Sequence, residues 1–204
     1  MESIEKLIEL FRKFPGIGPR QARRFVYFLL SQDPRLTKEL EIELAGLRTR
    51  IGQCGSCFRF FDQVKSDNLC DTCKNPNIDT HTLVIVEKDI DLDTIRKASN
   101  LHSRFFVLGG LIPILDKEAE KRIRLKELDK KLVEYLKNGL TEIICAFSAS
   151  PHADHTIEAL KEHINPIIVG KNVRISVLGR GLSTGTELEY SDAETIKQAL
   201  ANRK

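Results

Sequence analysis

Cys54-Gly55-Ser56-Cys57 is followed, after twelve intervening residues, by Cys70-Asp71-Thr72-Cys73. Two Cys-x-x-Cys pairs at this separation are typical of a single site in which four thiolates hold one zinc ion. The two-residue gap lets both sulfurs of a pair turn toward the same ion, and zinc binds four soft ligands tetrahedrally at roughly 2.3 Å. The stretch therefore predicts a four-cysteine zinc finger over residues 54–77, with one structural Zn²⁺ and four ligands: Cys54, Cys57, Cys70 and Cys73.

A site made only of thiolates leaves no open coordination position, so the predicted role of the metal is structural. The spacer between the pairs carries basic residues but also Asp62 and Asp67, which argues against a basic element that reads DNA. We interpret the finger as a structural joint between the segments on either side of it. A finger that contacts DNA directly is the alternative. Cys145, the fifth cysteine, lies in an apolar run and is expected to be a buried core thiol.

The size and charge of the chain narrow its class. At 204 residues it is long enough for one large or two small domains with a buried core. A net charge of +3 does not by itself identify a nucleic-acid binder. No apolar run reaches the ~18 residues of a membrane span, and the first residues lack the basic and apolar blocks of a signal peptide. We therefore expect a cytoplasmic protein with no membrane association, where paired cysteines bind metal more often than they form disulfides.

The segment before the cysteines, residues 1–53, has helical periodicity. Apolar residues follow a helical stripe over residues 3–14, and Pro15-Gly16-Ile17-Gly18-Pro19 then interrupts the helix. A second helix is expected up to Asp33-Pro34, because the residue before a proline avoids the α conformation. A third helix follows, for which the spacing predicts a buried apolar stripe made of Leu36, Leu40, Leu44, Leu47 and Ile51.

Two helices joined by Pro-Gly-Ile-Gly-Pro form the pattern of a helix-hairpin-helix. Glycines let the turn approach a partner closely, and the open amides at the start of the second helix suit a DNA phosphate. Positive side chains in that first turn oppose the helix dipole, which indicates that an external anion compensates them. The predicted DNA-binding residues, which contact the backbone without sequence preference, are Gly16, Gly18, Arg20, Arg23 and Arg24. The alternative is a plain helical turn with a solvated basic face.

Strands and helices alternate after the cysteines. Four short β-branched runs predict strands, at 83–86, 105–108, 143–147 and 173–177. Helical patterns lie between the last three of these, around 118–137 and 154–164. Such alternation is typical of a parallel sheet with helices on its faces, so the predicted fold class is α/β. The predicted division is a helical module at 1–53, the zinc finger at 54–77, an α/β domain at 78–172, and a C-terminal strand and helix at 173–204.

Four features occur in a fixed order along the chain: Phe14–Arg20, the four cysteines, Phe106–Gly110, and the block Gly179–Tyr190, which lies close to a Gly-rich GGELEY segment. In this order they resemble the RecR family of bacterial recombination mediators, and the resemblance covers essentially the whole chain. It implies a Toprim α/β domain, a ring-like homotetramer that clamps DNA, and an assembly role for residues 173–204. It also implies a role in DNA repair, in which single- and double-stranded DNA, RecO and possibly RecF are partners and RecA is loaded on gapped DNA at the nucleoid.

The chain departs from this pattern where Toprim enzymes bind magnesium. Such domains use a Glu after the first strand and an Asp-x-Asp after a later one. Glu87 fits the first position and Asp154 one of the later ones, but His152 stands where the second carboxylate would be. Because Mg²⁺ prefers hard oxygen ligands, this substitution weakens a magnesium site. His152 and His155 suit a transition metal better, although histidines near a helix start are more often surface residues. A second departure is Lys117–Glu120, where the family has further glycines.

Two roles stay open for Glu87 and Asp154. They could be the metal ligands of a nuclease or primase-like enzyme, or they could bind a basic partner such as RecO. No tyrosine is placed for topoisomerase chemistry, since Tyr27 and Tyr135 fall within predicted helices and are expected to pack there. The glycines after Gly179 lack the Gly-Lys-Ser/Thr of a phosphate-binding loop. The sequence therefore favours a DNA-repair scaffold that is not an enzyme.

Overall fold

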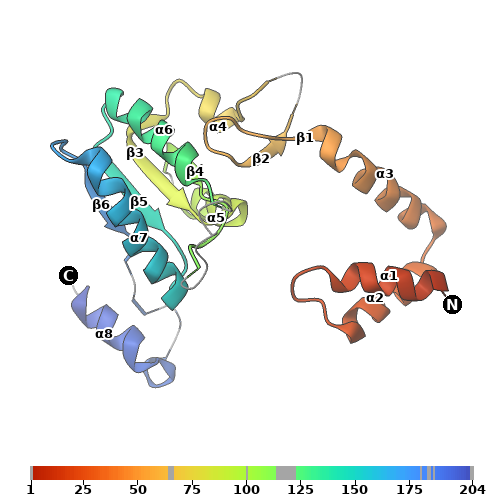
Figure 1. Ribbon diagram of the computed structural model, residues 1–204. Helices are drawn as coiled ribbons and strands as arrows, with labels where there is room; N and C mark the ends of the chain where they lie inside the picture. The colour runs from red at the N-terminus through yellow and green to blue at the C-terminus, as the bar shows by residue number, and fades with distance from the viewer. Residues whose placement is uncertain are drawn as a thin grey trace. The chain divides into compact units, whose positions relative to one another are not determined.

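The chain divides into two compact units, Met1–Ile51 and Gly52–Lys204. Figure 1 shows the elements of each unit along a computed structural model, which describes residues 2–63, 67–99, 101–113, 123–179, 181–182, 185 and 187–202. The first unit is helical and the second is of the α/β class, as predicted. The finer division into four segments stays a prediction.

Three helices make up the first unit: α1 (Glu2–Arg12), α2 (Pro19–Ser31) and α3 (Pro34–Arg50). The helices α1 and α2 bury Ile8 against Ala22 and Val26. Asp33 begins α3 as its N-cap and accepts a hydrogen bond from the backbone N–H of Arg35 at 2.8 Å. The predicted sequence of helix, Gly-rich turn and helix is therefore confirmed.

The buried stripe predicted for the third helix is wrong. Leu40, Leu44 and Leu47 are 40%, 64% and 53% exposed, and none of the described residues of α3 is buried. Ile51 belongs to the short strand β1 (Ile51–Gln53) instead of the helix. Apolar periodicity identifies the face of a helix that avoids water, but it does not say which surface covers that face. Within a single chain this face of α3 remains exposed.

The second unit contains a parallel sheet of four strands in the order β4-β3-β5-β6. Their bounds are β3 (Asp79–Val86), β4 (Ser103–Val107), β5 (Glu142–Ala146) and β6 (Arg174–Val177). At the centre of the sheet Ile85 pairs with Phe106 on one side and with Cys145 on the other. All four predicted strands are present, and the first begins at Asp79, earlier than expected. Cys145 is fully buried, and burial raises the pKa of its thiol to about 11, as fits a core residue.

Helices cover both faces of this sheet: α5 (Asp89–Ala98), α6 (Leu125–Lys137) and α7 (Pro151–Ile168) (Figure 1). Alternate residues of β3 point to opposite faces, so Leu83 joins the core under α6 and α7 while Val84 packs with Leu92 of α5. The sequence prediction missed α5, in which Leu92 is the one buried residue. The start of the helix expected at 118–137, and the departure at 117–120, lie outside the described residues.

The remaining elements flank the sheet. The four cysteines lie around a two-stranded sheet of β1 and β2 (Phe60–Asp62) and a single helical turn, α4 (Asp71–Lys74). After β6 the chain forms the 3-10 turn η2 (Leu188–Tyr190) and the helix α8 (Ala193–Ala201). None of the helices in the described ranges is both long and apolar enough to cross a membrane.

Gly109, just after β4, is the position in the sheet domain where we expect a substitution to be most informative. Its φ is +95°, and an added Cβ would lie 2.6 Å from Nη1 of Arg124, which donates to the Val107 carbonyl at 2.9 Å. Gly109→Ala should lower the free energy of unfolding by about 1–3 kcal/mol, measured by urea denaturation. Gly179→Ala is the matched control, because no heavy atom lies within 4 Å of its Cβ position. Equal stability of the two variants would contradict this account.

Candidate metal centre and nucleic-acid interface

The four predicted cysteine ligands converge. Their Sγ atoms all lie within 4.8 Å of one another, and the Cys57 and Cys70 sulfurs are 3.6 Å apart. Four sulfurs at the zinc–sulfur distance of about 2.3 Å from one tetrahedral ion would lie ~3.8 Å apart. All are free thiols, and three are essentially inaccessible to solvent. The spacing therefore fits one metal ion held by four sulfurs and is far too long for disulfides.

Backbone hydrogen bonds tie the two cysteine pairs together. The N–H of Cys70 donates to the Sγ of Cys54 at 3.4 Å, and the N–H of Gly55 donates to the Asn68 carbonyl at 2.8 Å. An added Cβ at Gly55 would lie 2.6 Å from the Asn68 side chain, so a larger residue there would displace that side chain. These backbone hydrogen bonds hold the two cysteine pairs so that their sulfurs converge on one point.

Hydrogen bonding among the sulfurs separates their pKa values. Contact with Cys57, followed by Cys70 and Cys73, lowers the pKa of the Cys54 thiol, whereas contact with Cys54 first of all raises the pKa of Cys57. The four thiols therefore do not titrate independently of one another. A soft divalent ion displaces such protons, because thiolates are the ligand form.

Three contacts anchor the first knuckle to the α/β sheet. The Val107 N–H, at the end of β4, donates to the Cys57 carbonyl at 2.8 Å. Phe58 has a positive φ of 62°, unusual for a large residue, and its ring packs on Phe106 with centroids 5.2 Å apart. The hydroxyls of Ser56 and Tyr135 are 3.0 Å apart. The four-cysteine site is therefore built into the α/β unit.

Tyr135 supports the knuckle from α6. It is buried, as expected from its predicted helix, and burial raises the pKa of its hydroxyl to about 12, so the group stays neutral. The guanidinium of Arg104 lies 4.3 Å from the centre of its ring. Sequence reasoning found the packing role of Tyr135 but not its hydrogen bond to Ser56, since nothing in the pattern relates positions 79 residues apart.

The hairpin turn leaves the start of α2 open. Gly16 has a φ of +76°, and Gly18 is an N-cap without a side chain that could accept a hydrogen bond from the helix. Pro19 has no N–H, and the next two amides, of Arg20 and Gln21, precede the first residue with an intrahelical acceptor. The geometry provides unsatisfied donors at the positive end of a helix dipole, which is what an anion requires.

Three arginines surround this helix start. Arg20, Arg23 and Arg24 are all exposed, and the first turn of α2 contains no acidic residue. Arg23 lies 4.0 Å from Glu5 at the limit of an ion pair. Neither Arg20 nor Arg24 forms a hydrogen bond or ion pair with any residue that the structure describes. Their positive charge is therefore available to an external anion.

Tyr27 does not have the packing role expected for it. Tyr27 is 56% exposed, and its neighbour Phe28 is 53% exposed. Both rings line an open groove along α2 together with Arg20, Arg23, Arg24 and Ser31. Arg23, Arg24 and Tyr27 follow Arg20 by three, four and seven residues, which is the spacing of one helix face. This spacing is the sequence signal that could have identified the shared face.

The acidic candidates of the sheet domain lie at one edge of the sheet. Glu87 directly follows β3 and Asp154 lies in the first turn of α7, which follows β5, and these two strands are parallel neighbours. The Glu87 side chain is 13% exposed and forms an ion pair of 2.6 Å with Lys88. His152 and His155 are exposed on the first turns of α7. Among the described residues, the cysteines are the one group of three or more metal-binding side chains close enough to share an ion.

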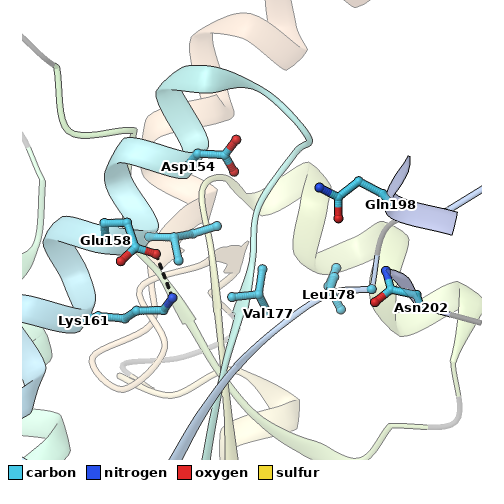
Figure 2. Close-up of a pocket in the computed structure, with 9 residues that line it drawn as sticks. Asp154, Glu158, Lys161, Val177, Leu178, Gln198 and Asn202 are labelled. Atoms are coloured by element: carbon cyan, nitrogen blue, oxygen red, sulfur yellow. Dashed lines mark hydrogen bonds and ion pairs between the residues drawn. The ribbon is translucent and has the colours of Figure 1, made fainter. Parts of the chain in front are cut away.

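Asp154 lines a cavity of about 350 Å³ formed by α7, the residues after β6, and α8. Figure 2 shows its carboxylate on the same side of α7 as Gln198 of α8, with the ion pair of Glu158 and Lys161 below it. Glu87 is not among the described residues that line this cavity. The two acids therefore share an edge of the sheet but not a pocket.

The metal centre yields a test of the cysteine assignment. Cys54→Ser should remove the bound metal and lower the free energy of unfolding by about 4 kcal/mol or more, because metal-binding energy is folding energy in such sites. Elemental analysis and thermal unfolding measure both effects. Cys145→Ala is the control, since this thiol is equally buried but lies outside the cluster, and it should keep the metal. A Cys54→Ser protein with full metal content and unchanged stability would contradict the assignment.

Comparisons with known proteins agree with this architecture. A family model described as "RecR, helix-hairpin-helix" matches residues 4–46, and one described as "RecR, C-terminal" matches residues 181–204. The Recombination protein RecR of Legionella pneumophila (strain Corby) is 33% identical over 203 residues, which cover 100% of this chain and 98% of that protein. The protein of the same name from Synechococcus sp. (strain CC9605) is 32% identical over 199 residues, 98% of each chain. With its hairpin, its four-cysteine knuckle and its parallel sheet in the same order, the chain belongs to the RecR family of recombination proteins.

Proposed function

We propose that this chain is a non-enzymatic, DNA-binding mediator of recombinational DNA repair that acts in the cytoplasm at the nucleoid. The observation that carries the proposal is the open start of α2, where Arg20 and Arg24 lack a partner among the described residues beside an uncapped helix end. A DNA phosphate supplies the missing negative charge at both the side chains and the amides. Contacts of this kind bind any sequence, as a mediator on gapped DNA requires.

Zinc is the metal that we propose for the four-cysteine site. Four thiolates form a soft, closed tetrahedral set, which favours zinc over hard cations such as Mg²⁺ and leaves no position for a substrate. The knuckle is bonded to the end of β4 through Cys57 and Val107. Zinc would therefore hold the sheet edge in shape and take no part in chemistry.

We propose that Glu87 and Asp154, at the carboxyl edge of the sheet, bind a partner protein and are not catalytic. A Toprim nuclease or primase-like enzyme is the alternative, with Glu87 and Asp154 as metal ligands. Glu87 already faces the ammonium group of Lys88, and His152 takes the place of a second carboxylate. Both features disfavour Mg²⁺. We propose RecO as the basic partner of this edge, with RecF as a possible second partner and RecA loading as the outcome.

Assembly into a ring-like tetramer is the last part of the proposal. The support lies in α3, where Leu40, Leu44 and Leu47 repeat at helical spacing and all remain exposed in the single chain. Such a stripe is costly to leave in water, so a second copy is a reasonable cover for it. Residues 173–204 are proposed to provide a further assembly contact.

The DNA-binding proposal is tested by the double variant Arg20→Ala/Arg24→Ala. Removing two phosphate contacts should weaken binding to single- and double-stranded DNA on the order of tenfold or more, and should reduce the slope of log K against log salt by about 1.5–2. Fluorescence anisotropy at several salt concentrations measures both quantities.

The matched control is Arg35→Ala, since Arg35 occupies the first turn of α3 but is already paired with Asp33 at 2.8 Å. Unchanged affinity of the double variant at moderate salt would refute the hairpin assignment. The same samples, incubated with plasmid DNA and Mg²⁺, report on the enzymatic alternative. Cleavage that disappears in Glu87→Ala would replace the mediator proposal by a nuclease.

The assembly proposal predicts the effect of charge on the α3 stripe. Leu44→Glu/Leu47→Glu should leave the monomer folded, because both side chains are more than half exposed, and should weaken assembly by about 100-fold or more. Light scattering after size exclusion gives the mass in solution. Ile90→Glu is the control, since Ile90 is 70% exposed on α5. A monomeric wild type, or an unchanged mass of the double variant, would exclude α3 as the contact.

A further inference from the structure

The face of α2 that carries the three arginines also carries two exposed aromatic rings. These side chains line one shallow, open groove along α2, formed by Arg20, Arg23, Arg24, Tyr27, Phe28 and Ser31. The opposite face of the same helix is occupied by the buried residues Ala22 and Val26. The aromatic rings are therefore not part of the core of this unit, and their exposure is unrelated to the packing of α1 on α2.

Phosphate binding accounts for the arginines but not for the rings. Tyr27 and Phe28 are each more than half exposed, so burial in the fold does not explain why large apolar groups occupy these positions. A groove that is cationic at one end and aromatic at the other fits a ligand with an anionic chain and flat apolar faces. Nucleotides with unpaired bases have both properties, whereas the bases of a duplex are stacked on one another and covered.

A second copy of the chain fits this groove less well. In a symmetric contact the same surface meets itself, so Arg20, Arg23 and Arg24 would approach the same arginines of the other copy. Like charges brought together oppose association, and Glu5 on α1 lies within ion-pair distance of Arg23 alone among the three. The first turn of α2 offers no acidic residue that would relieve this repulsion. Charge complementarity therefore favours a polyanion as the occupant.

We propose that Tyr27, with Phe28 beside it, is a stacking platform for an unpaired base of single-stranded DNA whose phosphates lie along Arg20 and Arg24. At 1.5 Å per residue the α-helix places Tyr27 ~4–5 Å beyond Arg24 and ~10 Å beyond Arg20, a span of a few nucleotides. This inference rests on the proposed DNA-binding function and extends it, because phosphate contacts bind both DNA forms while a stacked base requires a single strand. The platform would give the protein a preference for single-stranded over duplex DNA.

Substitution of Tyr27 separates stacking from charge. Tyr27→Leu keeps an apolar side chain but removes the ring, and should weaken binding to single-stranded DNA by about 10- to 100-fold while duplex affinity changes less than about twofold. The salt slope should stay as in the wild type, since no charge is lost. Leu30→Ala is the control on the same helix, because Leu30 is 64% exposed but does not line the groove, and should bind like the wild type.

Tyr27→Trp gives a direct signal, because the chain contains no tryptophan. Its fluorescence should be quenched by single-stranded DNA, and not by an abasic strand with the same number of phosphates.

Two outcomes would overturn the stacking platform: undiminished binding of single strands by Tyr27→Leu, or equal quenching of Tyr27→Trp by the abasic strand. The variant Arg20→Ala/Arg24→Ala still tests the hairpin in either case. A fall in the solution mass of Tyr27→Leu would also overturn the platform, since the ring would then contact another copy. If both Tyr27→Leu and Arg20→Ala/Arg24→Ala bind DNA like the wild type, the hairpin is not the DNA site.

Discussion

The hydrogen bond from the Val107 N–H to the Cys57 carbonyl joins the last residue of a sheet strand to the metal knuckle. The next two amides of the same segment bond to the neighbouring strand, since the N–H groups of Leu108 and Gly109 donate to the carbonyls of Val86 and Glu87. A hydrogen bond of this kind contributes only ~1 kcal/mol to stability. Its structural effect is larger, because one continuous ladder runs from the sulfur cluster to Glu87. The shape of the acidic edge therefore depends on the knuckle, although the metal takes no part in that edge.

The candidate binding residues lie in both units, outside the four-cysteine cluster. In the first unit the exposed charge is positive and concentrated at the start of α2, where Arg20 and Arg24 oppose the helix dipole. In the second unit Glu87 follows β3 and Asp154 lies in the first turn of α7, and they share the carboxyl edge of the sheet with Lys88, His152 and His155. Under the proposed function, the first unit binds a polyanion and the second binds a basic protein.

Much of this could be predicted because the decisive signals are local in the sequence. The cysteine spacing, the Gly-rich hairpin and the β-branched runs each fix a conformation within a few residues, and each was placed correctly. The sequence prediction missed α5 because the helix is short and buries little more than Leu92. The bond between Ser56 and Tyr135 could not be found, since it depends on how the knuckle docks on α6.

The two wrong predictions, the buried stripe of α3 and the packing of Tyr27, have the same physical origin. Periodicity identifies the apolar face of a helix, but it does not say whether the surface that covers this face belongs to the same molecule or to another. Within the described part of the first unit, the buried cluster consists of Ile8, Ala22 and Val26, which is a small core for about fifty residues. Such a unit buries little of its own apolar surface, and the surface left over lies on α2 and α3. The exposed side chains are therefore better explained by binding than by folding, because a fold that needed them for its own stability would have covered them.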